Sequence, residues 1–318
     1  MSRQPIRIGA RGSKLSLAQS GLMQARIAKA LGWDGVSDIE AYAQLIPIVT
    51  SGDRIQDRRL MEIGGKGLFT KEIEEALLDG RIDCAIHSLK DMPAELPPGL
   101  VLAATPERED PRDAFISHVA ERLEDLPKGA RLGTASLRRQ AQALHVRPDL
   151  DVVMLRGNVD TRLAKLERGE ADAILLAQSG LNRLGLGHLT RSWLDPLAAP
   201  PAPGQGALVI ETRADDVDLP WLQAVRCQAT TLAVAAERGA LYALEGSCRT
   251  AVGAHARLDG LALTLIVEAL TPDGALRFRR EGSVVLSSED AADEARALGL
   301  ELGAAVRAEG GPALILTD

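Results

Sequence analysis

The sequence LLDGRIDCAI at residues 77–86 returns in related form as LERGEADAIL at residues 166–175. The alignment matches Gly80 with Gly169 and places an aspartate three residues after each glycine. In both places the segment joins a predicted helix to a predicted apolar strand. The repeat therefore predicts two similarly built α/β units.

Strands alternate with helices on either side of the repeat. In the first unit we expect strands at 6–8, 44–49 and 82–86, a helix at 69–79, and an earlier helix with apolar positions Leu15, Ala18, Leu22, Ile27 and Leu31. In the second unit we expect three strands: one that ends at Leu132, one at 152–155 and one at 171–176. One helix should run through Leu144, and another through Leu163 and Leu166. Such alternation favours mainly parallel sheets.

The last third of the chain has a different pattern. After the proline-rich connection PLAAPPAPGQG at 196–206 come a strand at 207–211, a helix at 222–244 and alternating strands such as 261–267. A final helix is expected at about 289–307. This part predicts a separate small α+β domain. At 318 residues the chain is long enough for two or three domains.

Two turns have equivalent positions in the two units. GARGS at 9–13 and GTAS at 133–136 each end in a serine, Ser13 or Ser136, that could cap the next helix. Two α/β units with equivalent helix starts suggest capture of a ligand in a cleft between domains.

Composition excludes several classes of function. The chain has 37 basic and 44 acidic side chains, a net charge of −7, and only three Trp, two Tyr and three Phe. We therefore expect no nucleic-acid partner, because such binding relies on neutralised phosphates and on aromatic stacking. Three cysteines without Cys-x-x-Cys spacing predict neither a disulfide framework nor a zinc site. No signal peptide and no apolar span is visible, so we expect a cytoplasmic protein with no membrane partner.

Arg138 and Arg139 are adjacent in GTASLRRQ, where a turn opens a helix. Both could simply be solvated on a helix surface. Alternatively, with Thr134, Ser136 and the free N–H groups of the helix start, they would form a receptor for an anion. Four further arginines stand at strand-to-helix junctions, where α/β proteins bind ligands, and they favour the second interpretation: Arg11, Arg156, Arg162 and Arg183.

The segment HSLKDMP at 87–93 follows a predicted strand and presents Ser88, Lys90 and Asp91. Lys90 and Asp91 could be a solvated pair. At a cleft lined by arginines, the carboxylate would instead handle a proton or stabilise a developing cation. We expect His87 to be a hydrogen-bonded structural residue.

Among the cysteines, Cys248 in LEGSCRTAVG has small neighbours and an adjacent arginine, which favour exposure and thiolate character. From these residues alone its role stays open. Cys84 in an apolar strand predicts inert packing, and Cys227 on the predicted helix has no special context.

Nine segments together resemble the porphobilinogen deaminase (hydroxymethylbilane synthase) family. They occur in the family's order from residue 6 to about 254: IRIGARGSKLSLAQ, GGKGLFTKEIE, HSLKDMP, EREDPRDAF, GTASLRRQ, LRGNVDTRL, GLNRLGL, PGQGALVIE and LEGSCRTAVG. The resemblance implies two periplasmic-binding-protein-like domains flanking a cleft, plus a small C-terminal α+β domain. The implied boundaries are 1–105 with 201–220, then 106–200, then 221–318.

The resemblance also implies an activity and a cofactor. The enzyme would be a transferase that deaminates four porphobilinogen molecules and joins them head to tail into the linear tetrapyrrole hydroxymethylbilane. The chain would grow on a dipyrromethane cofactor held by a thioether to Cys248, and hydrolysis would release the product. No metal is implied. The protein would be a monomer, with the next enzyme of the pathway as a transient partner.

Residue roles follow from the same resemblance. Asp91 matches the catalytic aspartate, and Lys90 is expected to assist it. The expected cofactor-binding residues besides Cys248 are Arg11, Ser13, Ser88, Lys90, Asp91, Thr134, Ser136, Arg138, Arg139 and Arg162. The expected substrate-binding residues are Arg11, Arg156, Arg162 and Arg183. The segment 50–66 corresponds to an active-site loop that carries Lys66.

Two other classes of function compete with this enzyme. A two-lobed receptor for an anionic solute would have the same paired α/β units, but the third domain and Cys248 argue against it. An anion-binding regulatory module would also use the arginines, but no helix-turn-helix partner is apparent.

Overall fold

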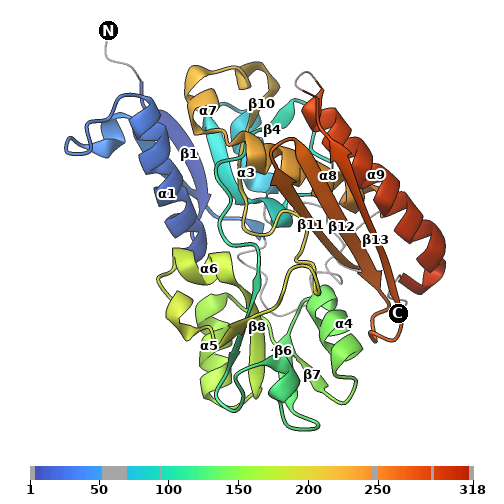
Figure 1. Ribbon diagram of the computed structural model, residues 1–318. Coiled ribbons are helices and arrows are strands. Elements are labelled where there is room, and N and C mark those ends of the chain that lie inside the picture. The colour runs from blue at the N-terminus through green and yellow to red at the C-terminus, as the bar shows by residue number, and fades with distance from the viewer. Residues whose placement is uncertain (1–3, 52–69, 94, 245–249, 288–289, 315–318) are drawn as a thin grey trace. The chain divides into compact units, whose positions relative to one another are not determined.

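The chain folds into two compact units in the computed structural model (Figure 1). The described residues are 4–51, 70–93, 95–244, 250–287 and 290–314. The first unit comprises Met1–Arg108 with Ala207–Thr231, and the second comprises Glu109–Gly206 with Leu232–Asp318. The chain therefore leaves the first unit, builds part of the second and comes back.

The first unit contains a five-stranded mixed sheet with the strand order β2-β1-β3-β10-β4. Its strands are β1 (Ile6–Arg11), β2 (Ala43–Ile48), β3 (Cys84–Ser88), β4 (Leu100–Ala104) and β10 (Leu208–Arg213). β1 is parallel to β2 and β3, whereas β10 is antiparallel to β3 and β4. The prediction of a mainly parallel sheet is confirmed, because β4, which is antiparallel to β10, runs in the same direction as β1, β2 and β3, and the returning strand β10 enters in the opposite direction.

Helix α1 (Lys14–Ala30) matches the predicted apolar face only in part, because Ile27 is buried but Leu22 is not. Leu22, expected inside, is 51% exposed, while Met23, Gln19 and Gln24 are buried. The two glutamines can be buried because they are hydrogen-bonded: Gln24 donates to a carbonyl at the start of β2, and Gln19 donates to Ser88. The other described α-helices of this unit are α3 (Lys71–Leu78) and α7 (Pro220–Val225).

The second unit contains another five-stranded sheet, with the order β7-β6-β8-β5-β9. Its strands are β5 (Asp113–Ser117), β6 (Arg131–Thr134), β7 (Asp151–Met154), β8 (Ala173–Ala177) and β9 (Ser192–Trp193). The helices around it are α4 (Leu137–Val146), α5 (Val159–Glu167) and α6 (Gln178–Arg183). β6 is parallel to β7 and β8, but β5 is antiparallel to β8 and β9. This sheet too is mixed.

The internal repeat is confirmed in atomic detail. The backbone N–H of Arg7 donates to Asp83 at 2.8 Å, and that of Arg131 donates to Asp172 at 2.7 Å. In both units the arginine side chain binds the same carboxylate. The glycines three residues before these aspartates have φ values of 69° and 70°, a backbone region that glycine adopts without steric cost. Asp83 thus joins β1 to the turn before β3, and Asp172 joins β6 to the turn before β8.

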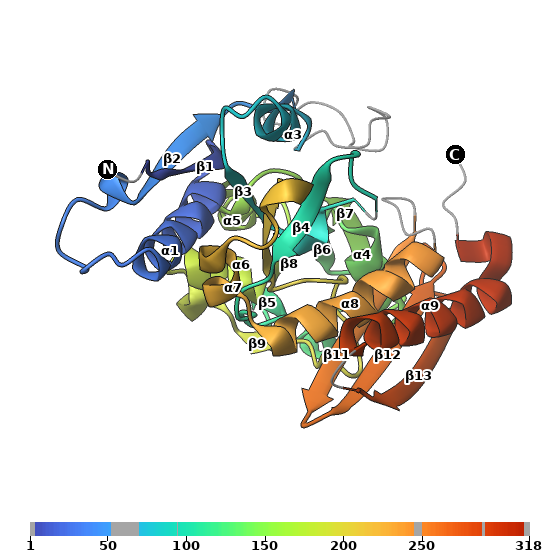
Figure 2. The same ribbon diagram turned by 90° about the horizontal axis from the view of Figure 1, so that it is seen from above.

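A three-stranded antiparallel sheet forms the rest of the second unit: β11 (Ala251–Asp259), β12 (Ala262–Leu270) and β13 (Arg277–Val285). Helices α8 (Gln228–Ala243) and α9 (Ala291–Gly310) share its hydrophobic core and lie side by side (Figure 2). The two helices pack closely at Gly299, where an added Cβ would lie 2.0 Å from the carbonyl oxygen of Ala236. The predicted helix 222–244 is in fact two, α7 and α8, and Cys227 lies between them.

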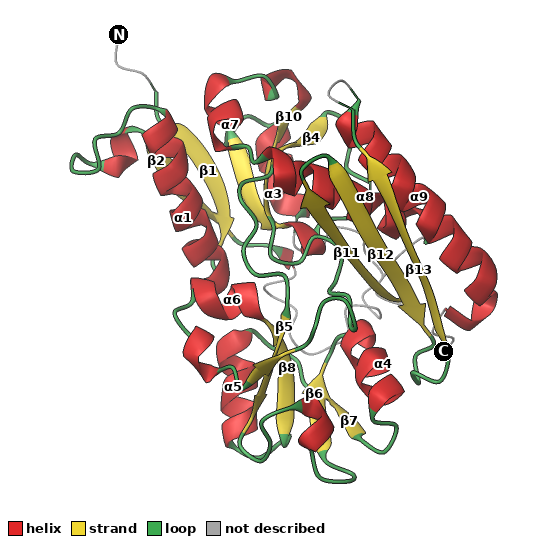
Figure 3. Cartoon of the chain, viewed as in Figure 1, coloured by secondary structure: helices red, strands yellow, loops and turns green. Residues whose placement is uncertain are grey.

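The α/β class with a small C-terminal α+β part is confirmed by these sheets (Figure 3). Helices alternate with most strands of the two five-stranded sheets, while the third sheet is made of three consecutive strands. Among the described helices, none combines the length and apolarity that crossing a bilayer requires.

Candidate active site

The segment with Asp91 begins where strand β3 ends. Ser88 is the last residue of β3, and a single 3-10 turn, Leu89–Asp91, follows it. Leu89 is buried and anchors the turn, Lys90 is half-buried and Asp91 is exposed. The side chain of Ser88 is held by the buried Gln19, whose Nε2 donates to Ser88 Oγ at 3.0 Å. The turn after β3 thus carries the carboxylate of Asp91 and the ammonium group of Lys90.

His87 supports this strand end from inside the first unit. Its Nε2 lies 3.0 Å from Glu211 Oε2, and both side chains are buried. This confirms the expectation that His87 is a hydrogen-bonded structural residue. Glu74, on α3, is buried as well, and burial raises its pKa, with the nearby carboxylate of Glu211 adding to the rise. Three titratable side chains, His87, Glu211 and Glu74, are therefore buried in the first unit.

The serines predicted to cap helices do so. Ser13 Oγ accepts a hydrogen bond from the backbone N–H of Ser16 at the start of α1, and Ser136 Oγ accepts from that of Arg139 at the start of α4. Thr134 Oγ1 in turn accepts from the N–H of Ser136 at 3.1 Å. These hydroxyl groups fix the two helix starts that the sequence predicted to be equivalent.

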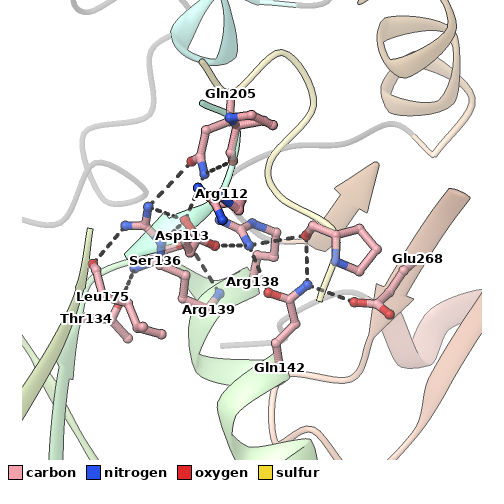
Figure 4. Close-up of polar contacts among 12 residues, drawn as sticks. Arg112, Asp113, Thr134, Ser136, Arg138, Arg139, Gln142, Leu175, Gln205 and Glu268 are labelled. Carbon is pink, nitrogen blue, oxygen red and sulfur yellow. Dashed lines mark hydrogen bonds and ion pairs between the residues drawn. The ribbon is translucent and has the colours of Figure 1, made fainter. Parts of the chain in front are cut away.

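Arg138 and Arg139 are both 5% exposed, so the interpretation as solvated surface residues was wrong. The fully buried Asp113 lies against both of them (Figure 4). Asp113 Oδ2 accepts from Arg138 Nη1 at 2.7 Å, and Oδ1 accepts from Arg139 Nη2 at 2.7 Å. Buried charges are tolerated when they are paired and hydrogen-bonded, and here one carboxylate serves two cations.

Neighbouring groups complete this buried cluster. Arg139 also donates from Nη1 to the carbonyl of Leu175 on β8, and Gln205 Nε2 donates to Asp113 Oδ1 at 2.8 Å. Burial alone would raise the pKa of Asp113, but the two guanidinium groups outweigh it and hold that pKa far below its usual range. The two guanidinium groups therefore favour the ionised form of Asp113.

The other four arginines lie at the predicted strand and helix ends. Arg11 is the last residue of β1 and Arg156 follows β7 closely. Arg162, in α5, donates from Nε to the carbonyl of Gly157 at 2.8 Å. Arg183 is the last residue of α6 rather than a loop residue, and its Nη2 donates to the carbonyl of Gly206 at 2.6 Å.

The predicted site residues fall into two sets. Arg11, Ser13, Ser88, Lys90 and Asp91 belong to the first unit, and Thr134, Ser136 and the other five arginines belong to the second. Within the second unit the structure brings Thr134, Ser136, Arg138 and Arg139 together around the start of α4. Cys248 and Lys66 lie outside the described residues.

The two described cysteines are Cys84 and Cys227. Cys84 is fully buried, and burial raises the pKa of its thiol far above the usual range, as inert packing predicts. Among the described residues, no group of three or more His, Cys, Asp and Glu side chains is placed to hold a metal ion.

Family models match the chain over most of its length. Residues 6–220 match "porphobilinogen deaminase, dipyromethane cofactor binding domain", and residues 231–308 match the C-terminal domain of porphobilinogen deaminase. The chain belongs to the porphobilinogen deaminase family. The first of these family domains contains the Asp91 segment, the Asp113 cluster and all six arginines, while Cys248 falls in the second.

Curated relatives agree with the family models. The chain is 92% identical to porphobilinogen deaminase of Caulobacter sp. (strain K31), with both chains covered completely. It is 84% identical to porphobilinogen deaminase of Caulobacter vibrioides (strain NA1000 / CB15N), again over the whole of both chains. Among solved structures, a periplasmic substrate-binding protein of an ABC transporter from Coxiella burnetii is similar with a TM-score of 0.41 and 17% identity, covering 69% of this chain and 89% of that one.

Sequence reasoning missed Asp113 as a site residue. It lies in EREDPRDAF, one of the segments that resemble the porphobilinogen deaminase family, but no role was assigned to it. One signal was present: Asp113 opens the run DAFIS, whose residues are all buried in β5. An acidic residue at the start of a buried strand requires a partner inside the protein.

Proposed function

We propose that this chain is a hydroxymethylbilane synthase, as its membership of the porphobilinogen deaminase family indicates. It deaminates porphobilinogen and joins four molecules head to tail into a linear tetrapyrrole. The growing chain is held on a dipyrromethane cofactor attached through Cys248, and hydrolysis then releases the product. The family's cofactor-binding domain spans two thirds of the chain, residues 6–220.

One observation in the structure carries the fit to such a ligand. Arg138 and Arg139 contribute two positive charges to a buried cluster in which Asp113 supplies one negative charge. In addition, Arg138 Nε is buried and has no hydrogen-bond partner among the described residues. A buried donor next to a surplus positive charge suits a carboxylate. Pyrroles that carry acetate and propionate groups supply such carboxylates.

When bound, the cofactor supplies a covalently held primer with a nucleophilic pyrrole carbon. The protein's own residues bind, orient and balance charge around it. Asp91, exposed at a fixed strand end, stabilises the positive charge that develops when the substrate loses ammonia and accepts a hydrogen bond from a pyrrole N–H. Lys90 is the adjacent cation in the same turn.

The remaining arginines hold carboxylates of the substrate and of the lengthening chain. We assign Arg11, Arg156, Arg162 and Arg183 to the substrate, with Arg11 and Arg162 also contacting the cofactor. Ser13, Ser88, Thr134 and Ser136 support cofactor binding at the strand and helix ends that they already organise. Lys66 acts from the segment 50–66. Charge-assisted hydrogen bonds of this kind contribute about 1.5–3 kcal/mol each, but their sum would overcount the affinity.

The organisation of the protein is proposed in the same way. The three domains are 1–105 with 201–220, 106–200, and 221–318, which is supported by three separate sheets with their own hydrophobic clusters. The enzyme acts as a cytoplasmic monomer, and its product passes to the next enzyme of the pathway, with which it interacts transiently.

Turnover of porphobilinogen by the purified chain tests this function. The chain alone, without added metal or nucleotide, should consume porphobilinogen and release ammonia in equal amounts, and should form one linear tetrapyrrole for every four substrate molecules consumed. Binding of porphobilinogen without consumption would instead support the solute receptor and overturn the proposal.

A further inference from the structure

The buried arginine pair has one positive charge more than its carboxylate can neutralise. Arg138 and Arg139 face the single carboxylate of Asp113. The nearby Glu268 is engaged elsewhere: its Oε2 binds Arg277 at 2.6 Å, and its Oε1 accepts from the neutral Gln142. The pair is also buried almost completely, so water cannot screen the surplus charge.

The two guanidinium groups use their hydrogen-bonding edges differently. Arg139 presents its Nε and Nη2 side to Asp113 Oδ1, at 3.0 and 2.7 Å, and its Nη1 to the carbonyl of Leu175. All recorded hydrogen bonds of Arg138 leave from Nη1, toward Asp113, Gln142 and the carbonyl of Pro200. The same chemical edge, Nε with Nη2, is therefore filled in Arg139 and unfilled in Arg138.

Asp113 itself is held from several elements of the unit. It opens strand β5, and Gln205 Nε2 donates both to Asp113 Oδ1 and to the carbonyl of Pro111, each at 2.8 Å. On the other side of the cluster, Gln142 accepts from Arg138 and donates to Glu268 on β12 (Figure 4). Asp113 is thus bound by Gln205 and by both arginines, and each of its two oxygens binds one arginine.

We propose that Asp113 is a positioning residue for ligand binding: it neutralises one of the two guanidinium groups, holds both side by side, and leaves the Nε edge of Arg138 for a single carboxylate of the bound pyrrole chain. Without Asp113, two adjacent buried cations would repel each other and turn toward any available acceptor. With it, the pair binds one negative charge at a defined place. This inference rests on the proposed function, because that function supplies the pyrrole carboxylate.

A simpler role for Asp113 would be to stabilise the fold alone. The two roles differ in what they predict for cofactor loading. If Asp113 only stabilises the fold, loading should follow stability in every variant. If it positions the arginines, loading should fall further than stability alone explains.

The test compares Asp113→Asn and Asp113→Glu with a matched control, Asp172→Asn. Asp172 forms an ion pair with Arg131 of the same sheet and has no contact with Arg138 or Arg139. For each full-length variant we would measure the unfolding midpoint, the fraction that carries the covalent adduct by intact mass, and KM and kcat for porphobilinogen.

Asp113→Asn should reduce the adduct fraction or slow its formation by about tenfold or more, as loss of a residue that orients a ligand-binding group commonly does. Asp113→Glu keeps the charge and should fold, recover part of the loading, and raise KM more than it lowers kcat. Asp172→Asn should lower the midpoint without changing the adduct fraction.

Two results would overturn the proposal. One is wild-type loading and KM in both Asp113 variants. The other is a loss of adduct in Asp172→Asn equal to that in Asp113→Asn at the same loss of stability. If Asp113→Asn does not fold, Asp113→Glu decides alone through its KM and loading. Failure of the proposed function is distinguishable, because then the unsubstituted chain itself would neither carry the adduct nor consume porphobilinogen.

Discussion

Replacing Gly206 with alanine should destabilise the second unit strongly, because the backbone there has a positive φ and leaves no space for a Cβ. Gly206 has φ = 88°, and a Cβ there would lie 2.3 Å from the carbonyl oxygen of Glu109. The left-handed conformation costs a residue with a Cβ about 1–2 kcal/mol. Forcing an extra carbon into a packed site costs about 1–3 kcal/mol more. The free energy of unfolding should therefore fall by about 2–5 kcal/mol.

Gly129→Ala is the matched control for this substitution. Gly129 has a similar φ of 73°, but an added Cβ would meet nothing within 4 Å. It should show only the conformational cost, about 1–2 kcal/mol. Urea unfolding followed by circular dichroism measures both, and the comparison of midpoints requires unchanged m-values. The carbonyl of Gly206 also accepts from Arg183, so Gly206→Ala should raise KM as well. Equal midpoints for the two variants would show that the carbonyl of Glu109 does not obstruct a Cβ at position 206.

Two further predictions concern the first unit. Asp91→Asn should keep the fold and the covalent adduct but lose turnover by about 100- to 1000-fold, as removal of one electrostatic stabiliser does; near-normal kcat with intact adduct would contradict its role. Glu74→Gln should stabilise the protein at neutral pH. Burial raises the pKa of Glu74, so the folded state binds more protons than the unfolded state, and the wild type loses stability as pH rises from the unfolded pKa through the folded one. The advantage of Glu74→Gln should disappear below about pH 4, the unfolded value, and an advantage independent of pH between 4 and 8 would show that burial does not shift Glu74.

Local features of the fold could be predicted from the sequence because they depend on neighbouring residues. The caps by Ser13 and Ser136, and the matched aspartates Asp83 and Asp172, follow from short motifs. The buried face of α1 could be predicted from apolar spacing only in part, since Ile27 is buried as predicted but Leu22 is exposed. Its buried Gln19 is compensated by Ser88, which lies 69 residues away in the sequence.

The candidate site shows the same limit. The adjacent arginines in GTASLRRQ indicated an anion site, but the sequence did not reveal that one of the anions is internal. Asp113 lies 25 residues before Arg138, on a strand that was not predicted. Only the antiparallel pairing of β5 with β8 brings it to the start of α4. The position of Asp113 beside the arginines therefore depends on the order and direction of the strands, which short motifs do not reveal.

Intact mass spectrometry of the purified protein tests directly whether the cofactor is attached covalently, since a covalently held dipyrromethane must add to the mass of the chain. The unsubstituted protein should exceed its sequence mass by one dipyrromethane unit, and Cys248→Ser should have its own sequence mass with no excess. A wild-type mass equal to the sequence mass, in a preparation that still turns over porphobilinogen, would show that the chain carries no covalent cofactor. An unchanged excess in Cys248→Ser would contradict the attachment site.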